Sequence, residues 1–275
     1  MATGYDVIIM AGQSNAVGFG YGDTDNPFIQ NENILELSDT YNMKFVQDDN
    51  GVDRLDLQFP PLENQLYYGV ARELFAYDRE NASLANSFAQ EYVRRGYLKE
   101  GRKLLIVKTS VGGTGFAKKH WNEGCLCSER MYYMIDKALE ISPDMKIVAF
   151  LWHQGEHDAF ENADFDSQRR ESYHKEELGK LFRNIRKRYK DHTFPIIAGE
   201  FVREWIEKNR VACDAVIRAI NSVLSEIGNS AFITSEGLLS NGKKNGSADI
   251  LHFCRDALME FGVRYFNEFE KLIKA

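Results

Sequence analysis

Five short apolar runs, separated by longer amphipathic stretches, constrain the fold of this chain more than any other feature. The runs cover residues 6–11, 104–109, 146–152, 194–198 and 231–234. Continuous apolar runs of this length are typical of strands buried on both faces of a parallel sheet. Apolar residues recur at helical spacing over residues 83–95, 129–140, 173–189, 212–227 and 257–273. Strands that alternate with helices predict an α/β fold, in which a parallel sheet carries helices on both faces.

The domain organisation is simple by the same reading. No linker rich in Pro, Gly or Ser and no internal repeat interrupts the 275 residues, so we expect a single domain over residues 1–275. The 44% of hydrophobic residues is ordinary for a globular protein and excludes a disordered chain. The longest region without strong periodicity is 18–63, which we expect to be a long loop, and loops of this length in compact domains are usually functional or mobile.

Charge and cysteine content exclude several function classes. The chain has 41 acidic and 34 basic residues, a net charge of −7, whereas a nucleic-acid surface needs a basic excess. No apolar stretch approaches the roughly 20 residues that span a bilayer, and no signal peptide is visible. We therefore expect a soluble protein that binds neither nucleic acid nor membrane. It would be cytoplasmic as written, or secreted if a native leader was removed. Oligomeric state is not predicted.

No metal or cofactor is expected. The four cysteines are Cys125, Cys127, Cys213 and Cys254. Cys125 and Cys127 form C-x-C, which lacks the paired C-x-x-C spacing of a zinc ribbon. Free or buried thiols explain all four.

Polar clusters follow the predicted strands, where open α/β sheets bind their ligands. The sequence Gly-Gln-Ser-Asn ends the first run at 12–15, Gly-Gly-Thr follows the second at 112–114, and His-Gln-Gly-Glu-His-Asp follows the third at 153–158. Asp-Ile-Leu-His at 249–252 precedes the last helix. Taken singly, each cluster has an ordinary structural explanation, such as a helix cap at Ser14 or a turn at 112–113. Together they supply a nucleophile, a base, an acid and backbone donors.

These residue types suit acyl transfer. A serine hydroxyl becomes a good nucleophile when a neighbouring imidazole accepts its proton, and a carboxylate then orients that imidazole. Ser14 and His252 fill the first two roles. Asp249 and Glu156 are both candidates for the carboxylate. Fixed backbone N–H groups would stabilise the oxyanion that forms during attack.

The motifs AGQSNAVG, SVGGTGF, WHQGEHD and DILHF, in this order, resemble those of SGNH-type hydrolases. Within that superfamily they are similar to carbohydrate esterase family 6 and to sialate O-acetylesterase-like domains, from residue 6 to about residue 274. The resemblance implies a flavodoxin-like three-layer α/β/α sandwich with a central, mostly parallel sheet. It also implies hydrolysis of O-acetyl groups on sugars.

The resemblance also implies roles for particular residues. Ser14 would be the nucleophile and His252 the general base, with Asp249 as the acid by the superfamily pattern or Glu156 by the family 6 pattern. The oxyanion donors would be the backbone N–H groups of Ser14 and Gly113 and the side-chain amide of Gln154. We expect substrate contacts from Asn15, Trp121 and His153. His157 departs from the pattern, because many relatives carry Ser at that position.

We therefore predict a serine-dependent carbohydrate O-acetylesterase that works through an acetyl-enzyme. Its partner would be an acetylated glycan, with acetyl xylan the first expectation. A sialate O-acetylesterase or another acyl-ester hydrolase is the alternative. A sialic acid substrate would call for a cation beside its carboxylate, and Arg54 or Lys118 could supply one.

Three further alternatives remain, two from other classes and one on the same scaffold. Residues 153–157 match H-x-x-E-H, a zinc-peptidase motif that requires both histidines on one helix face, yet the run before it favours a strand. A non-catalytic carbohydrate-binding protein could keep an esterase fold. A lipid or thioester hydrolase would favour an apolar groove, whereas 18–63 is rich in polar residues.

Overall fold

The computed structural model describes residues 4–25, 27–39, 42–47, 53–58, 66–76, 79–160, 164–190 and 193–275. For residues 42–47, 53–58, 74–76 and 79 only the course of the backbone is described here.

A seven-stranded sheet forms the centre of the molecule, in the order β11-β10-β9-β1-β8-β2-β5. Its strands are β1 (Gly4–Gly12), β2 (Ile34–Asp39), β5 (Leu66–Val70), β8 (Arg102–Lys108), β9 (Met145–His153), β10 (Ile196–Gly199) and β11 (Ser230–Ile233). All neighbours are parallel except β2 and β5. Strand β1 lies between β8 and β9, and the chain extends the sheet on one side of β1 with β2, β5 and β8 and then on the other with β9, β10 and β11. A crevice for ligands is expected beyond the carboxyl end of such a strand.

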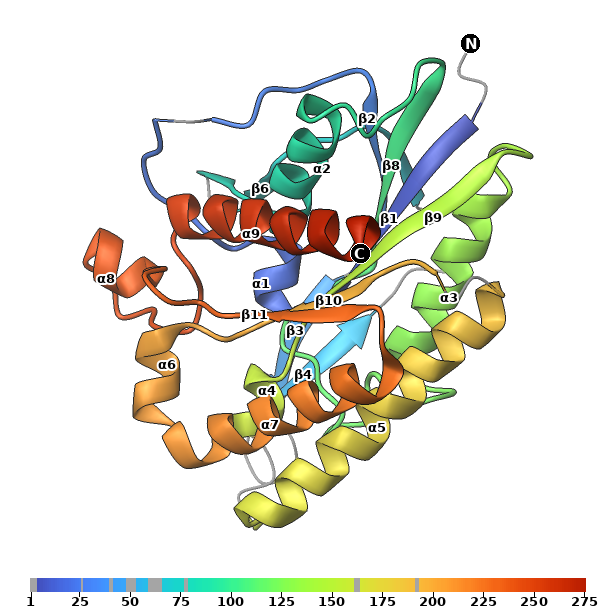
Figure 1. Cartoon of the computed structure of the whole chain (residues 1–275). Helices are drawn as coiled ribbons and strands as arrows, with labels where there is room; N and C mark the ends of the chain where they lie inside the picture. The colour runs from blue at the N-terminus through green and yellow to red at the C-terminus, as the bar shows by residue number, and fades with distance from the viewer. Residues whose placement is uncertain are drawn as a thin grey trace.

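Helices pack on both faces of this sheet (Figure 1). Helices α2 (Leu84–Arg94) and α9 (Arg255–Lys274) cover one face, and α3 (Leu126–Leu139), α5 (Ser167–Tyr189) and α7 (Arg210–Ile227) cover the other. The shorter helices are α1 (Ser14–Val17), α4 (Glu156–Phe160), α6 (Arg203–Lys208) and α8 (Asn241–Asn245). Alternate residues of β1 serve the two cores, Val7 and Ile9 on one side and Ile8 and Met10 on the other. Burial on both faces explains why β1 is apolar throughout.

The five predicted strands and five predicted long helices are confirmed, with ends shifted by a few residues. The expected loop at 18–63 is wrong in part, because it contains β2 and the hairpin strands β3 (Asn42–Gln47) and β4 (Asp53–Gln58). Glu36 interrupts the apolar residues of β2, so this strand does not appear as an apolar run in the sequence. Its carboxylate is buried and pairs with Lys108 Nζ of β8 at 2.5 Å. A charged residue can therefore occupy a central strand when its partner is supplied by the next strand.

Two further features complete the fold. Strands β6 (Leu74–Ala76) and β7 (Arg79–Asn81) form a second small hairpin. Among the helices in the described part of the chain, none is long and apolar enough to cross a membrane.

Candidate active site

Ser14 lies where β1 turns into helix α1. Gly12 has a φ of +134°, and a Cβ at this position would collide with the backbone carbonyl of His153. Only glycine allows the chain to turn so close to β9. The Gln13 N–H donates to the His153 carbonyl at 2.9 Å, and Ser14 begins the helix with 7% of its surface exposed. Among the described residues, neither the hydroxyl nor the N–H of Ser14 has a hydrogen-bond partner, so both are open to a ligand.

Asp249 and His252 form a hydrogen-bonded pair. The imidazole Nδ1 lies 3.1 Å from Asp249 Oδ1 and 3.0 Å from Oδ2. A tight turn produces this geometry, because the backbone N–H groups of Leu251 and His252 also donate to Asp249 Oδ1, each at 3.1 Å. Asn241 Nδ2 donates to Oδ2 at 2.9 Å. Burial raises the pKa of Asp249, but the hydrogen bonds from His252 and Asn241 outweigh it and lower the pKa to about 2.

Asn15 fastens the turn of His252 to the helix that begins with Ser14. Its side-chain Nδ2 donates to the Leu251 carbonyl at 3.2 Å, and its Oδ1 accepts from the Phe253 N–H at 3.1 Å. These bonds hold the residues on either side of His252. The imidazole is thereby anchored next to the residue that follows Ser14 in the chain.

Glu156 occupies a different position from Asp249. It is almost fully buried, and its Oε1 accepts from Asn15 Nδ2 at 2.8 Å and lies 3.2 Å from His153 Nε2. Burial raises the pKa of Glu156, but the charge and hydrogen bond of His153 and the hydrogen bond of Asn15 outweigh it, and the net shift is downward. Of the two candidate acids, the structure brings Asp249 to the imidazole of His252, and it places Glu156 behind Asn15.

Gln154 does not offer a free amide at this site. Its side chain is fully buried, and its Nε2 lies 2.8 Å from Asp158 Oδ2, 3.3 Å from the Thr114 carbonyl and 3.5 Å from Gln13 Oε1. If the amide oxygen and nitrogen were exchanged, the amide oxygen would lie against the Asp158 carboxylate and the two would repel, so this orientation is fixed. The expected role of Gln154 as an oxyanion donor does not fit these contacts. The backbone N–H groups of Ser14 and Gly113 have no acceptor among the described residues.

The three expected substrate contacts, Asn15, Trp121 and His153, are fully buried. Trp121 Nε1 donates to Thr114 Oγ1 at 2.8 Å, and the Trp121 ring packs edge-on against Trp152. All three side chains have protein partners, so they support the site from behind and present no surface to a substrate here. Sequence reasoning placed them by their nearness to Ser14, Gly113 and Gln154 along the chain, and nearness does not fix the direction of a side chain.

The family of the chain follows from comparison with known proteins. A family model described as carbohydrate esterase, sialic acid-specific acetylesterase, matches residues 4–271. The chain belongs to this family. It is accordingly a carbohydrate acetylesterase by family, a class of carboxylic ester hydrolase, as the sequence motifs predict.

Solved structures show the same fold. The esterase matches NanS with a TM-score of 0.72 and 17% identity, covering 99% of this chain and 98% of NanS. A protein from Arabidopsis thaliana matches with a TM-score of 0.67 and 18% identity, covering 98% of this chain and 99% of that protein. A carbohydrate acetylesterase from Xanthomonas citri matches with a TM-score of 0.55 and 14% identity, covering 97% of this chain and 56% of that enzyme. No curated protein sequence matches the chain significantly.

The zinc alternative fails on geometry. His153 ends strand β9 while His157 lies in helix α4, and Gly155 between them has a φ of +144°. The two histidines therefore do not share one helix face, which the zinc motif requires. Within the described ranges, no group of three or more His, Cys, Asp or Glu side chains could hold a metal ion.

Residues near the rim of the site can be placed only in part. The backbone N–H of His157 donates to Gln13 Oε1 at 3.2 Å, and the His157 ring lies 6.4 Å from the ring of His120. Arg54 lies in β4, where side chains are outside the described residues. Lys118 follows the loop of Gly113 and has an interaction partner of its own.

Three supporting residues escaped the sequence analysis. Asn241 bonds Asp249, Asp158 bonds Gln154, and His174 lies 3.2 Å from Asp158. Asp158 was visible as the last residue of the polar run after β9, but it carried no assigned role. Asn241 and His174 lie 8 and 16 residues from their partners, and no local pattern distinguishes them from ordinary helix residues.

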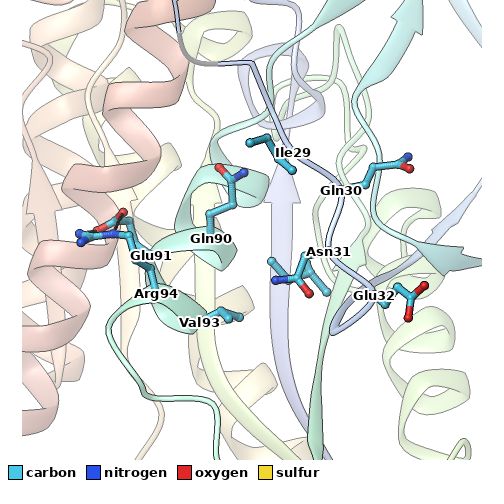
Figure 2. A pocket seen from close by; sticks show the side chains of 9 residues that line it. Ile29, Gln30, Asn31, Glu32, Gln90, Glu91, Val93 and Arg94 are labelled. Carbon is cyan, nitrogen blue, oxygen red and sulfur yellow. Dashed lines mark hydrogen bonds and ion pairs between the residues drawn. The ribbon is translucent and has the colours of Figure 1, made fainter.

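A separate groove lies between segment 29–34 and helix α2 (Figure 2). Its volume is about 620 Å³, and segment 29–34 and helix α2 line it, including Gln30, Gln90 and Arg94. Ile34 begins β2, so the groove lies at an amino end of the sheet, whereas Ser14 follows a carboxyl end. This groove is therefore not part of the active site of the esterase.

Proposed function

We propose that this esterase is serine-dependent, with Ser14 as nucleophile, His252 as general base and Asp249 as the orienting acid. The observation that carries the proposal is the Asp249–His252 pair, together with the bonds from Asn15, the residue after Ser14, to the residues on either side of His252. The imidazole keeps 23% of its side chain exposed, so it can exchange a proton with a bound substrate or water.

The reaction would proceed in two halves. His252 Nε2 takes the proton of the Ser14 hydroxyl as its oxygen attacks the acetyl carbonyl, and the new oxyanion accepts hydrogen bonds from the N–H groups of Ser14 and Gly113. The carbon–oxygen bond to the sugar then breaks, and His252 returns the proton to the departing sugar hydroxyl. Water attacks the acetyl-enzyme with the same base, which releases acetate and restores Ser14. Asp249 holds Nδ1 protonated throughout, so that Nε2 is the atom that carries the reacting proton.

The substrate would be an O-acetylated sugar. Because the family is described as sialic acid-specific, we propose O-acetylated sialic acid as the first substrate to test. Acetyl xylan, which was favoured from the sequence, stays a prediction. The match to XAC1771 of Xanthomonas citri, a carbohydrate acetylesterase, shows a shared fold and does not choose between the two sugars.

We further infer that the whole chain forms one domain with the flavodoxin-like three-layer architecture of SGNH-type hydrolases. A family match over residues 4–271 and helices on both faces of one sheet support this inference.

Acetate release tests the proposed function. We expect the native protein to release acetate from O-acetylated sialic acid or from acetylated xylo-oligosaccharides, and we expect a metal chelator to leave that rate unchanged. Ser14→Ala should abolish release from both sugars. Activity that survives in Ser14→Ala and disappears with the chelator would replace the serine mechanism by a metal-dependent one. No release from either sugar by the native protein would count against carbohydrate deacetylation.

A further inference from the structure

Asp158 is a buried carboxylate that the proposed reaction does not use. It lies in helix α4, two residues after Glu156, with 4% of its surface exposed. Its Oδ1 accepts from the Ala117 N–H at 2.7 Å. Its Oδ2 accepts from the Phe116 N–H at 3.2 Å and from Gln154 Nε2 at 2.8 Å. Both oxygens of Asp158 are therefore committed to partners within the protein.

Helix α5 supplies a further partner. His174 Nδ1 lies 3.2 Å from Asp158 Oδ2, and His174 is itself 1% exposed and packs edge-on against Phe116. The Arg170 guanidinium donates to the backbone carbonyl of Asp158. Burial raises the pKa of Asp158, but the hydrogen bonds from His174, Ala117 and Gln154 outweigh it, and the net shift is downward. A buried carboxylate with four donors stays charged, and each of its hydrogen bonds is stronger than a neutral one.

The segment that Asp158 holds begins with the backbone donor of the proposed oxyanion site. Phe116 and Ala117 lie three and four residues after Gly113. The intervening Gly115 is pressed against Asp158, because a Cβ there would lie 2.6 Å from Asp158 Oδ1. Two more bonds fasten the same loop, from Gln154 Nε2 to the Thr114 carbonyl and from Thr114 Oγ1 to the Val111 carbonyl at 2.6 Å. Asp158 thus fixes the loop directly through two backbone N–H groups and indirectly through Gln154.

We propose that Asp158 is a positioning residue for catalysis: by holding the loop 113–117, it positions the backbone N–H of Gly113. The inference rests on the proposed function, since it assigns the Gly113 N–H to the oxyanion. Asp158 contacts no substrate in this proposal. Because Asp158 acts only through the loop, its loss should destabilise the transition state more than it weakens substrate binding.

Asp158→Asn is the variant that tests the proposal. An asparagine is nearly the same size, but one of its two terminal atoms becomes an NH₂ group. In the native protein, both carboxylate oxygens of Asp158 accept from N–H donors. Either orientation of the new amide therefore places its NH₂ group against one of these donors. We expect the loop to shift and kcat to fall about 100-fold, with KM changed by less than about threefold, because small misplacements of catalytic groups are costly.

Asp6→Asn is a matched control. Asp6 is also 4% exposed, and it accepts from Tyr92 Oη and Arg102 Nε, each at 2.8 Å. It lies near the start of β1, at the sheet edge opposite Ser14. The control loses a buried carboxylate of the same exposure, so it should lower Tm as well, but it should leave kcat of the folded protein within about twofold. Both variants are compared at a temperature where each is folded.

Gly115→Ala is a second variant that tests the proposal if Asp158→Asn does not fold. The added methyl group pushes the loop from Asp158 while the carboxylate remains. We expect kcat to fall about tenfold with KM little changed.

Hydrogen exchange of residues 111–120 gives a readout that does not depend on activity. The amides of Phe116 and Ala117 should exchange faster in Asp158→Asn than in the native protein or in Asp6→Asn. Unchanged exchange, or a kcat loss no larger than that of Asp6→Asn, would overturn the inference. A native protein that releases no acetate would overturn the proposed function instead, and exchange alone would then decide whether Asp158 holds the loop.

Discussion

The two edges of the central sheet differ in how they hold their polar groups. At the carboxyl edge, Asn15, Gln154, Glu156 and Asp158 are each no more than 4% exposed and bond to one another and to nearby backbone. At the amino edge, several of the side chains that line the groove of about 620 Å³ are exposed to solvent, and Ile29 is 74% exposed.

This difference shows what makes one edge suitable for catalysis. Reaction rates gain from donors and bases that are already in place, because no energy is then spent on arranging them during the reaction. At the carboxyl edge the buried bonds hold the His252 turn and the Gly113 loop, while Ser14 and His252 remain accessible. In the groove, water reaches the polar groups of exposed side chains such as Gln30 and Arg94.

Ser14→Ala, at the carboxyl edge, should give the largest effect of all these variants. We expect kcat/KM for acetate release to fall by about 10⁴-fold or more, because the nucleophile is lost. Stability should hardly change, since the Ser14 hydroxyl has no partner among the described residues. Acetate assays and thermal unfolding measure the two quantities. A variant that keeps more than a tenth of native activity would contradict the assignment of Ser14.

Asp249→Asn should follow, with kcat lower by about 10³-fold. The asparagine would present an NH₂ group to His252 Nδ1 and favour the wrong tautomer. Steady-state kinetics at neutral pH with the native substrate measure this loss. A decrease of less than threefold would show that Asp249 is not the acid of this site.

Glu156→Gln should affect stability more than chemistry. The change leaves His153 without its buried negative partner, at 3.2 Å, and we expect it to cost about 3 kcal/mol in unfolding free energy. We expect kcat to fall only about tenfold, because Asn15 loses one strong bond but keeps those to the His252 turn. Urea unfolding and kinetics are compared with those of Asp249→Asn. A larger kcat loss for Glu156→Gln at unchanged stability would exchange the roles of the two acids.

Acid should weaken the native fold through Asp249. Its pKa is lowered to about 2 in the folded chain from an ordinary value near 3.8, so its charged form stabilises the fold. This contribution is fully present above pH 4 and is lost as pH falls from about 4 to 2, at most about 2 kcal/mol. Unfolding free energies of the native protein and Asp249→Asn, measured between pH 5 and 2, should converge at the acid end. Parallel curves would show that Asp249 carries no such shift.

Substitutions in the groove should have the smallest effect. Ile29→Ser and Gln30→Ala change exposed side chains, so we expect kcat and KM within about twofold of native values and stability within about 0.5 kcal/mol. The same acetate assay and thermal unfolding apply. A tenfold loss of kcat in either variant would mean that the two edges are coupled, and the contrast between them would fail.

Much of this molecule was predictable because its signals are local. Buried parallel strands must be apolar, so the runs at β1, β8 and β9 appear directly in the sequence, and the polar residues after them mark one edge of the sheet. Strand β2 was missed because Glu36 is buried only with the help of Lys108, a residue 72 positions away. The direct pairing of Asp249 with His252 likewise depends on a turn whose geometry the spacing alone left open.

The sequence by itself determined the α/β fold class and the positions of five strands along the chain. It also contains the family motifs that include Ser14, Gly113, Glu156 and His252. Only the tertiary structure decided which of two acids meets the imidazole, that Gln154 and Trp121 face inward, and that Asp158 holds the loop 113–117. The physical reason is that strand and helix patterns follow from each residue's own burial. Hydrogen-bond partners come from several elements, and the direction of a side chain is fixed only when those elements are packed together.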